Sequence, residues 1–177
     1  MNTKKTNIVQ LVFELLKDSQ YFLKEAEKHH SNQMLEQRFI RASIISAWSG
    51  FEGWINKTCS DFAKTIPNLG IHGIGFLLEK RIELKMGQFE LTNSDKYESI
   101  ENKMEYLLRR FANYTLDKST KSWKNFVQAK IIRDSIAHPK EGCETVYSLS
   151  DGILTINTLR QFLNLLSKKI YRSNRTF

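Results

Sequence analysis

Cysteine is scarce in this sequence, and its pattern suits neither a disulfide framework nor a zinc site. Cys59 and Cys143 stand far apart, and neither belongs to a CxxC pair or to a Cys/His cluster with metal-ligand spacing. The sequence therefore predicts reduced thiols in a cytoplasmic protein and no structural zinc. Nothing in it calls for another metal or a cofactor.

Long apolar runs are also absent. The first residues, MNTKKTNIVQLVFELL, place lysines ahead of apolar side chains, but Glu14, Lys17 and Asp18 interrupt the run too early for a signal peptide. No other stretch approaches the roughly 18 apolar residues of a membrane-spanning helix. We therefore expect a protein that stays in the cytoplasm and does not enter a membrane.

Helix-breaking residues are few, with only 2 prolines and 8 glycines among 177 residues. Between them, apolar residues recur every three or four positions, which predicts amphipathic helices. The pattern gives helices over about 7–29, 34–64, 76–85, 95–112, 119–137 and 158–172, the fifth capped by Ser119 or Thr120 and the last by Asn157. A chain of this length has the size of one domain, so residues 1–177 are expected to form a single domain.

Two segments depart from the helical pattern. Residues 65–75, TIPNLGIHGIG, contain one proline and three glycines and are expected to form a loop. Asp151-Gly152 lies between two β-prone runs and is a dipeptide favoured in two-residue hairpin turns. The predicted fold is therefore all-α, a bundle of about five to six helices with a small hairpin or loop excursion before the last helix.

Basic residues outnumber acidic residues in this sequence. Lys and Arg total 27 against 19 Asp and Glu, a formal net charge of +8, the sign expected of a protein that binds phosphate backbones. The basic residues are scattered, however, and form no polybasic arm. A lysine-rich surface without a nucleic-acid partner explains the same totals.

The stretch IIRDSIAHPK, residues 131–140, places a charged pair inside an apolar helical run and a histidine directly before a proline. Residues five apart lie about 140° apart around a continuous helix, so Arg133 and His138 cooperate only if the helix ends between them. Pro139 predicts that end, because it disfavours helical backbone at the residue before it. His138 is then expected at a helix C-terminus, where an imidazole can exchange a proton near neutral pH.

Structural roles for the same residues stay open. A histidine near a helix end often caps the last carbonyls, and Arg133 can form an ion pair with Asp134 or with a neighbouring helix. Asp134 is either a carboxylate on the helix surface or a residue that holds the site. Glu52 is either a solvated residue at the edge of an apolar helix face or a carboxylate that orients Arg133 or His138.

Two separated segments resemble the HEPN superfamily. KIIRDSIAHPK, in the penultimate helix, resembles the family's Arg-x4-6-His motif, in which a polar residue usually follows the arginine; here these residues are Arg133, Asp134 and His138. RFIRASIISAWSGFEGWINK, residues 38–57, looks like the family's second helix, which is apolar with an embedded acidic residue, here Glu52. A last amphipathic helix follows the motif, as the family pattern requires.

The resemblance implies a helical bundle that dimerises so that the motif helices of two subunits meet, and many members are metal-independent endoribonucleases. His138 suits proton transfer to or from the RNA, and Arg133 suits binding of the phosphoryl oxygens, because its planar fork remains charged. In HEPN toxins with a nucleotidyltransferase antitoxin, a tyrosine commonly stands two residues after the histidine. Lys140 occupies that place here, which argues against regulation through such a tyrosine and makes Lys140 a candidate phosphate contact.

The resulting expectation is a homodimeric endoribonuclease that acts on RNA without metal, in a bacterial toxin or anti-phage defence setting. An antitoxin or another regulatory partner protein belongs to that expectation. The alternative is a non-catalytic HEPN-like module that binds RNA, a nucleotide or a protein. A purely structural helical subunit is a third interpretation, and the Arg133/His138 pair favours the enzyme over both.

Overall fold

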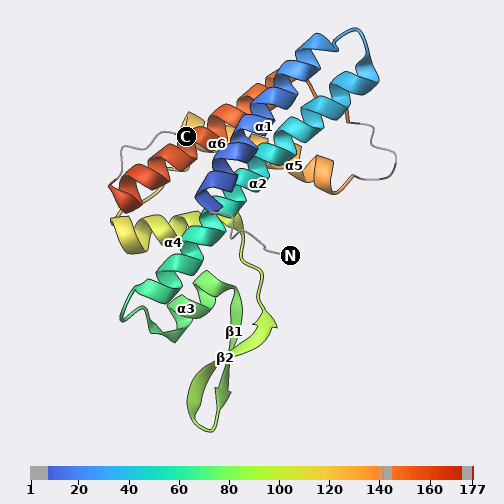
Figure 1. The fold of residues 1–177 in the computed structure, drawn as a ribbon. Coiled ribbons are helices and arrows are strands. Elements are labelled where there is room, and N and C mark those ends of the chain that lie inside the picture. Colours follow the sequence, from blue (N-terminus) through green and yellow to red (C-terminus); the bar gives the residue numbers. More distant parts are fainter. Residues whose placement is uncertain (1–7, 140, 142–144, 173–176) are drawn as a thin grey trace, which may run out of the picture. The chain divides into compact units, whose positions relative to one another are not determined.

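The computed structural model describes residues 8–139, 141, 145–172 and 177. Within these residues the chain forms six helices and one two-stranded sheet (Figure 1). The elements are, in chain order, α1 (Ile8–Lys28), α2 (Gln33–Thr65), α3 (Gly70–Leu78), β1 (Lys80–Lys85), β2 (Gln88–Asp95), α4 (Ile100–Ala112), α5 (Lys121–Ala137) and α6 (Leu149–Tyr171). The expected fold class, a mainly helical bundle with a small hairpin, is confirmed. No helix in the described ranges is both long enough and apolar enough to cross a membrane.

The chain divides into two compact units. The first unit comprises residues 1–51 and 116–177, and the second unit comprises residues 52–115. Helix α2 contributes to both, because the division falls inside it between Phe51 and Glu52. Each unit buries apolar side chains of its own, and the two are described separately.

The first unit contains α1, the first part of α2, α5 and α6, and α6 packs against both α1 and α5 (Figure 1). Aromatic rings fill its centre, with centroids 4.9–5.8 Å apart. The rings belong to Trp48, Phe51, Trp123, Phe126 and Phe162. Pairs at this spacing contribute roughly 0.5–1.5 kcal/mol each beyond their burial, so this cluster fixes how α2, α5 and α6 meet.

Side-chain caps set where α5 and α6 begin. The Thr120 hydroxyl accepts a hydrogen bond from the backbone N–H of Trp123, so one of the two expected caps of α5 is found. Helix α6 begins much earlier than predicted, at Leu149, because Ser148 and Asp151 form a capping box. Asp151-Gly152 therefore lies in the first turn of α6, and the hairpin predicted there, like the Asn157 cap, is wrong.

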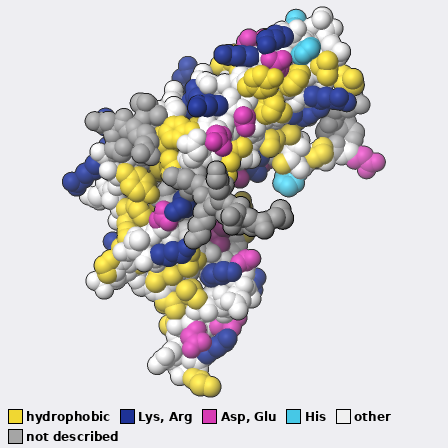
Figure 2. Space-filling model, in the orientation of Figure 1, with side chains coloured by type: hydrophobic (Ala, Val, Ile, Leu, Met, Phe, Trp, Pro, Cys, Tyr) yellow, Lys and Arg dark blue, Asp and Glu magenta, His cyan; other side chains and the backbone are white. Residues whose placement is uncertain are grey.

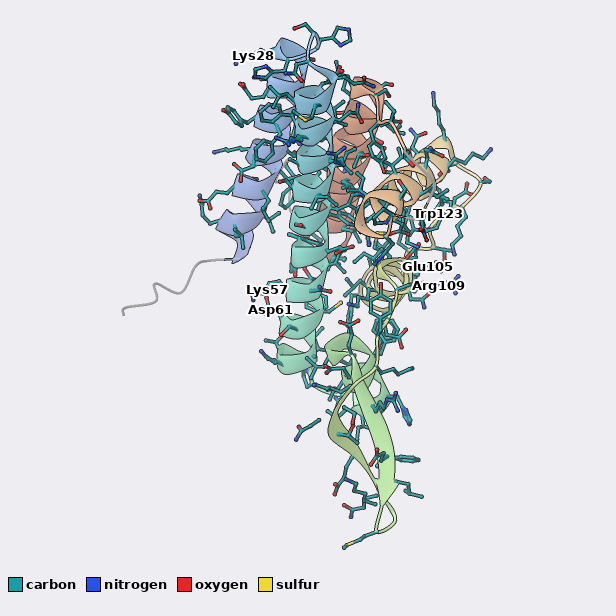
Figure 3. All side chains as sticks on the ribbon, turned by 90° about the vertical axis from the view of Figure 1, so that its right-hand side faces the viewer. Lys28, Lys57, Asp61, Glu105, Arg109 and Trp123 are labelled. Atoms are coloured by element: carbon teal, nitrogen blue, oxygen red, sulfur yellow. The ribbon has the colours of Figure 1, made fainter. Side chains whose placement is uncertain are left out.

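The second unit contains the rest of α2, α3, the β1–β2 hairpin and α4. Its buried residues come mainly from α2 and α4: Trp54, Ile55, Cys59, Ile100, Met104, Leu107 and Leu108. On the exposed side of α2, Lys57 and Asp61 form an ion pair one turn apart (Figure 3). Ser99 caps α4 by accepting from the backbone N–H of Asn102, so α4 begins a few residues later than expected.

The hairpin lies in the second unit, where the sequence pattern predicted a helix over residues 76–85. Helix α3 instead occupies Gly70–Leu78, so it begins inside the expected loop, includes only the first three residues of the predicted helix, and ends at Glu79, whose φ of 54° is left-handed. Beyond it, Ile82 lies opposite Leu91 and Leu84 lies opposite Phe89 in an antiparallel ladder. The alternation of charged and apolar residues over 81–85 is the period of a strand, and this signal outweighs the helical interpretation.

Candidate functional site

Arg133 lies in the last two turns of α5, and its guanidinium is held from two sides. Its Cζ lies 5.1 Å from the centroid of the Trp48 indole ring, within the range of a cation–π contact. Its Nη1 lies 3.0 Å from Oδ1 of Asp134. The side chain is 18% exposed, so the charge is largely withdrawn from solvent yet reachable at one edge. This arrangement fixes a cation in one orientation.

Trp48 is itself a rigid support. It is almost entirely buried, and its ring contacts Phe51 and Phe126. The indole Nε1–H donates a hydrogen bond to the backbone carbonyl of Ala129, at 3.2 Å. That bond ties α2 to α5 one turn before Arg133. The ring beneath the guanidinium therefore cannot turn away without breaking a buried hydrogen bond.

The helix ends at His138, as Pro139 predicts. Its backbone N–H still donates to the carbonyl of Asp134, at 2.9 Å, but its φ of −131° and ψ of 66° have left the helical region. His138 and Pro139 are both exposed. The imidazole therefore stands at the C-terminal end of α5 in contact with solvent, where it is accessible to a ligand.

Asp134 joins the charged residues of this helix end. Its carboxylate lies beside the Arg133 guanidinium and 3.8 Å from Nζ of Lys130, one turn earlier. The ion pair between Arg133 and Asp134, which was one of the structural roles considered for these residues, is therefore present. It is compatible with a second role, because the carboxylate orients the guanidinium and remains 41% exposed itself.

Gln37 and Ser135 hold Tyr147, which lies two residues before the start of α6. The Gln37 side chain donates to the Tyr147 carbonyl at 2.6 Å and accepts from its backbone N–H at 2.8 Å. The Tyr147 hydroxyl lies 3.0 Å from Oγ of Ser135, in the last turn of α5. Neither Gln37 nor Tyr147 could be predicted from the sequence, because the two residues are far apart in the chain and carry no motif.

Two further residues, Glu52 and Lys140, were predicted to belong to the site. Glu52 lies on α2 in the second unit and is half-buried. Its predicted contact with Arg133 or His138 stays a prediction. Lys140 lies outside the described residues, so its suggested phosphate contact also stays a prediction.

Other titratable groups do not extend the site. Burial raises the pKa of the Cys59 thiol to about 12, which makes it a poor nucleophile. A hydrogen bond between Nδ1 of His30 and the Glu36 carboxylate raises the pKa of His30, which lies between α1 and α2. Across the described ranges, no cluster of three or more His, Cys, Asp or Glu side chains has the arrangement of a metal site.

The formal charge is divided unequally between the two units. Residues 1–51 and 116–177 contain 18 Lys and Arg against 10 Asp and Glu, a net charge of +8. Residues 52–115 contain 9 of each sign and have no net charge. The whole excess of the chain therefore belongs to the unit that carries Arg133 and His138. An anionic ligand would be attracted to that unit rather than to the other.

Comparisons with known protein families, with curated proteins and with solved structures give no match.

Proposed function

We propose that this protein is a metal-independent endoribonuclease of the HEPN type, with Arg133 and His138 in its active site. The observation that carries the proposal is the end of α5: the helix stops at His138, which is exposed, five residues after an arginine fixed over Trp48. A scaffold has no need of a guanidinium held against Trp48 in the same helix end that carries an exposed imidazole. The net charge of the first unit supports an RNA ligand.

In the proposed reaction, the 2′-oxygen of a nucleotide attacks the adjacent phosphorus while the bond to the 5′-oxygen breaks. The 2′-hydroxyl loses its proton, and the leaving 5′-oxygen gains one. The products are a 2′,3′-cyclic phosphate and a 5′-hydroxyl. His138 performs one of these proton transfers, and Arg133 stabilises the charge on the phosphoryl oxygens.

A homodimer would complete the site. Two proton transfers require two groups, and a second subunit supplies a second His138 together with a second Arg133. The family resemblance suggests that the motif helices of two subunits meet, so we propose a homodimer with RNA as substrate. A cytoplasmic toxin or defence role, with an antitoxin or regulatory partner, follows from the same resemblance.

The test is cleavage of single-stranded and looped RNA by the purified protein in EDTA. His138→Ala should lower the rate by about 10²–10⁴-fold, the usual contribution of a general acid or base. Arg133→Ala should be comparably slow, with weaker RNA binding. The matched controls are His30→Ala and Arg38→Ala, which remove exposed residues of the same types from the same unit and should leave the rate unchanged.

The substrate and the products sharpen the test. DNA of the same sequence should remain intact, because it lacks the attacking 2′-hydroxyl. Product ends should be a cyclic phosphate and a 5′-hydroxyl, which mass spectrometry distinguishes from a 5′-phosphate. If the wild type leaves varied RNAs intact, or if His138→Ala cuts as fast as His30→Ala, the nuclease proposal is wrong. If no protein cleaves RNA, but the affinity for RNA differs between the wild type and the Arg133→Ala or His138→Ala variant, the non-catalytic binding module is favoured instead.

A further inference from the structure

The β1–β2 hairpin of the second unit has one apolar face, and that face is only partly covered. The inner pair, Ile82 and Leu91, contacts α3, where a Cβ at Gly75 would come within 2.8 Å of Ile82 Cδ1. The outer pair, Leu84 and Phe89, is 63% and 55% exposed. Isolated two-stranded hairpins are marginal in water, so exposed apolar pairs at the outer half call for a partner surface.

The outer edge of β1 is open for strand pairing. Lys85 and Gln88 flank the two-residue turn and form the first hydrogen-bonded pair, so Glu83 is the next β1 residue to bond β2. The backbone groups of Ile82 and Leu84 therefore point away from β2. Neither makes another backbone hydrogen bond in the described part of the chain. Such an edge is a template for a further strand.

The residue at the hairpin tip is unusual for its position. Met86 and Gly87 both have positive φ, 49° and 82°, as a type I′ turn requires. Asn, Asp or Gly normally occupies the first position, because a side chain such as Met is strained there. Met86 is nevertheless fully exposed, and Figure 2 shows hydrophobic side chains at this tip. A strained, exposed and adaptable apolar side chain is explained if it enters a partner.

The charges along β1 are complementary to a second copy of the same strand. If two β1 strands pair antiparallel about a two-fold axis at Leu84, Glu83 of each copy lies opposite Lys85 of the other. In the same register, Ile82 lies opposite Met86. Within its own hairpin Glu83 lies opposite Glu90, an unfavourable pair of like charges. Lys85 of the same strand, whose Nζ lies 3.6 Å from Oε2 of Glu83, offsets part of that repulsion, and a lysine from a second copy would offset more of it.

We propose that the open edge of β1 is a homotypic interface, in which two copies pair through Leu84 to form a four-stranded antiparallel sheet. The outer apolar pairs of both hairpins then form one continuous face. A groove of about 740 Å³ is lined by His72 and Phe76 of α3 together with Ile82 of β1 and Phe89 of β2. Met86 of the second copy comes opposite Ile82 and so reaches the wall of this groove.

Charge argues for a protein occupant of this groove over RNA. Two of the three basic residues that line it, Lys80 and Lys96, already pair with Asp95 and Glu98, at 2.6 and 2.9 Å, and the second unit has no net charge. A second hairpin offers apolar side chains that can pack against the exposed apolar residues of the first, whereas a phosphate backbone offers none. The inference does not rest on the nuclease proposal, because it uses no residue of that site.

Charge exchange across the interface tests the proposal. Glu83→Lys places lysine opposite lysine, and Lys85→Glu places glutamate opposite glutamate, so each variant alone should show half the wild-type mass in light scattering at micromolar concentration. An equimolar mixture restores both opposite-charge pairs and should recover the wild-type mass. Both positions are exposed, so circular dichroism should be unchanged.

A cysteine at the axis gives an independent test of the register. In a Cys143→Ser background, Leu84→Cys should form an intermolecular disulfide on mild oxidation, because the two Cα atoms of such a pair lie about 5.5 Å apart. Arg81→Cys, on the same strand but opposite Gly87, should not. A monomeric wild type, an unchanged mass for Glu83→Lys, or a mixture that fails to reassociate would overturn the proposal. So would RNA binding that is lost in Phe89→Ala.

Discussion

The Arg133 guanidinium lies against the face of the Trp48 indole ring, 5.1 Å from its centroid. The two residues come from different helices, α5 and α2, and the same indole also donates to the Ala129 carbonyl. One buried ring therefore both joins the helices and supports the cation. The proposed phosphate-binding group is consequently in contact with the core of the first unit. Substitutions in that core should therefore alter the position of the Arg133 guanidinium.

The two roles of Trp48 can be separated by substitution. Trp48→Phe keeps an aromatic face beneath Arg133 but removes the hydrogen bond to Ala129, and it should lower the free energy of unfolding by about 1–2 kcal/mol. Trp48→Leu removes the aromatic face as well. At a temperature where both variants are folded, RNA cleavage should be slower in Trp48→Leu than in Trp48→Phe. Equal rates would show that the ring contributes packing alone.

The helical framework could be predicted largely because it depends on local signals. α1, α2 and α5 lie within a few residues of their expected ranges, and Thr120 caps α5 as one of the two candidates. The end of α5 was predictable from Pro139 alone, since the effect of proline on the preceding residue is local. The position of His138 at that helix end therefore followed from the sequence.

Features that depend on tertiary contacts were not predictable. Asp151-Gly152 has a strong local preference for a hairpin, but the Ser148 capping box and the packing of Gly152 against Leu23 place it in α6. The observed hairpin carries Met86 at the turn position that Asn, Asp or Gly usually occupies, so the sequence contains no turn signal there. The contacts of Arg133 with Trp48, and of Gln37 with Tyr147, join residues without any sequence pattern.

Two glycines should respond oppositely to alanine. A Cβ at Gly75 would meet Ile82 Cδ1 at 2.8 Å and Leu91 Cδ2 at 3.2 Å, so Gly75→Ala should push the hairpin from α3 and destabilise the protein by about 1–3 kcal/mol. A Cβ at Gly53, inside α2, meets nothing within 4 Å, so Gly53→Ala should stabilise the protein by about 0.5–1 kcal/mol. Urea unfolding of both variants checks the signs. Stabilisation by Gly75→Ala would contradict the observed packing.

The His30–Glu36 pair should make stability depend on pH. The Nδ1 of His30 lies 2.7 Å from the Glu36 carboxylate, and this hydrogen bond raises the pKa of His30. Its contribution is therefore complete below the unfolded pKa, about 6.5, and is lost as the pH rises through the higher folded pKa. Unfolding curves of wild type and Glu36→Gln should differ most under mildly acidic conditions and converge under alkaline ones. A difference that grows with pH would show that the pair has the opposite effect.

Lys103 should be the charged residue of the second unit whose loss is most costly. It is 4% exposed, and its Nζ lies 2.9 Å from the Glu79 carboxylate and 2.8 Å from Oδ1 of Asn56. The ammonium thus joins α4 to α2 and to the end of α3. Lys103→Met keeps the volume but leaves Glu79 without this cation, and it should destabilise the protein by about 3–5 kcal/mol. The control Lys57→Met, which breaks the exposed pair with Asp61, should cost less than about 1 kcal/mol in the same thermal or urea measurement.

Cys59 should be inert to thiol reagents in the folded protein. It is 1% exposed in the core of the second unit, and this burial raises the pKa of its thiol to about 12. Only the thiolate reacts, so near neutral pH the buried group offers almost no nucleophile as well as little access. In a Cys143→Ser background, labelling by iodoacetamide should be negligible under native conditions and complete in denaturant. The native labelling rate should also track the global unfolding equilibrium, so Lys103→Met should label faster than Lys57→Met. If native labelling is rapid and its rate does not change with the stability of the variant, the reagent reaches Cys59 through local opening of α2 and α4.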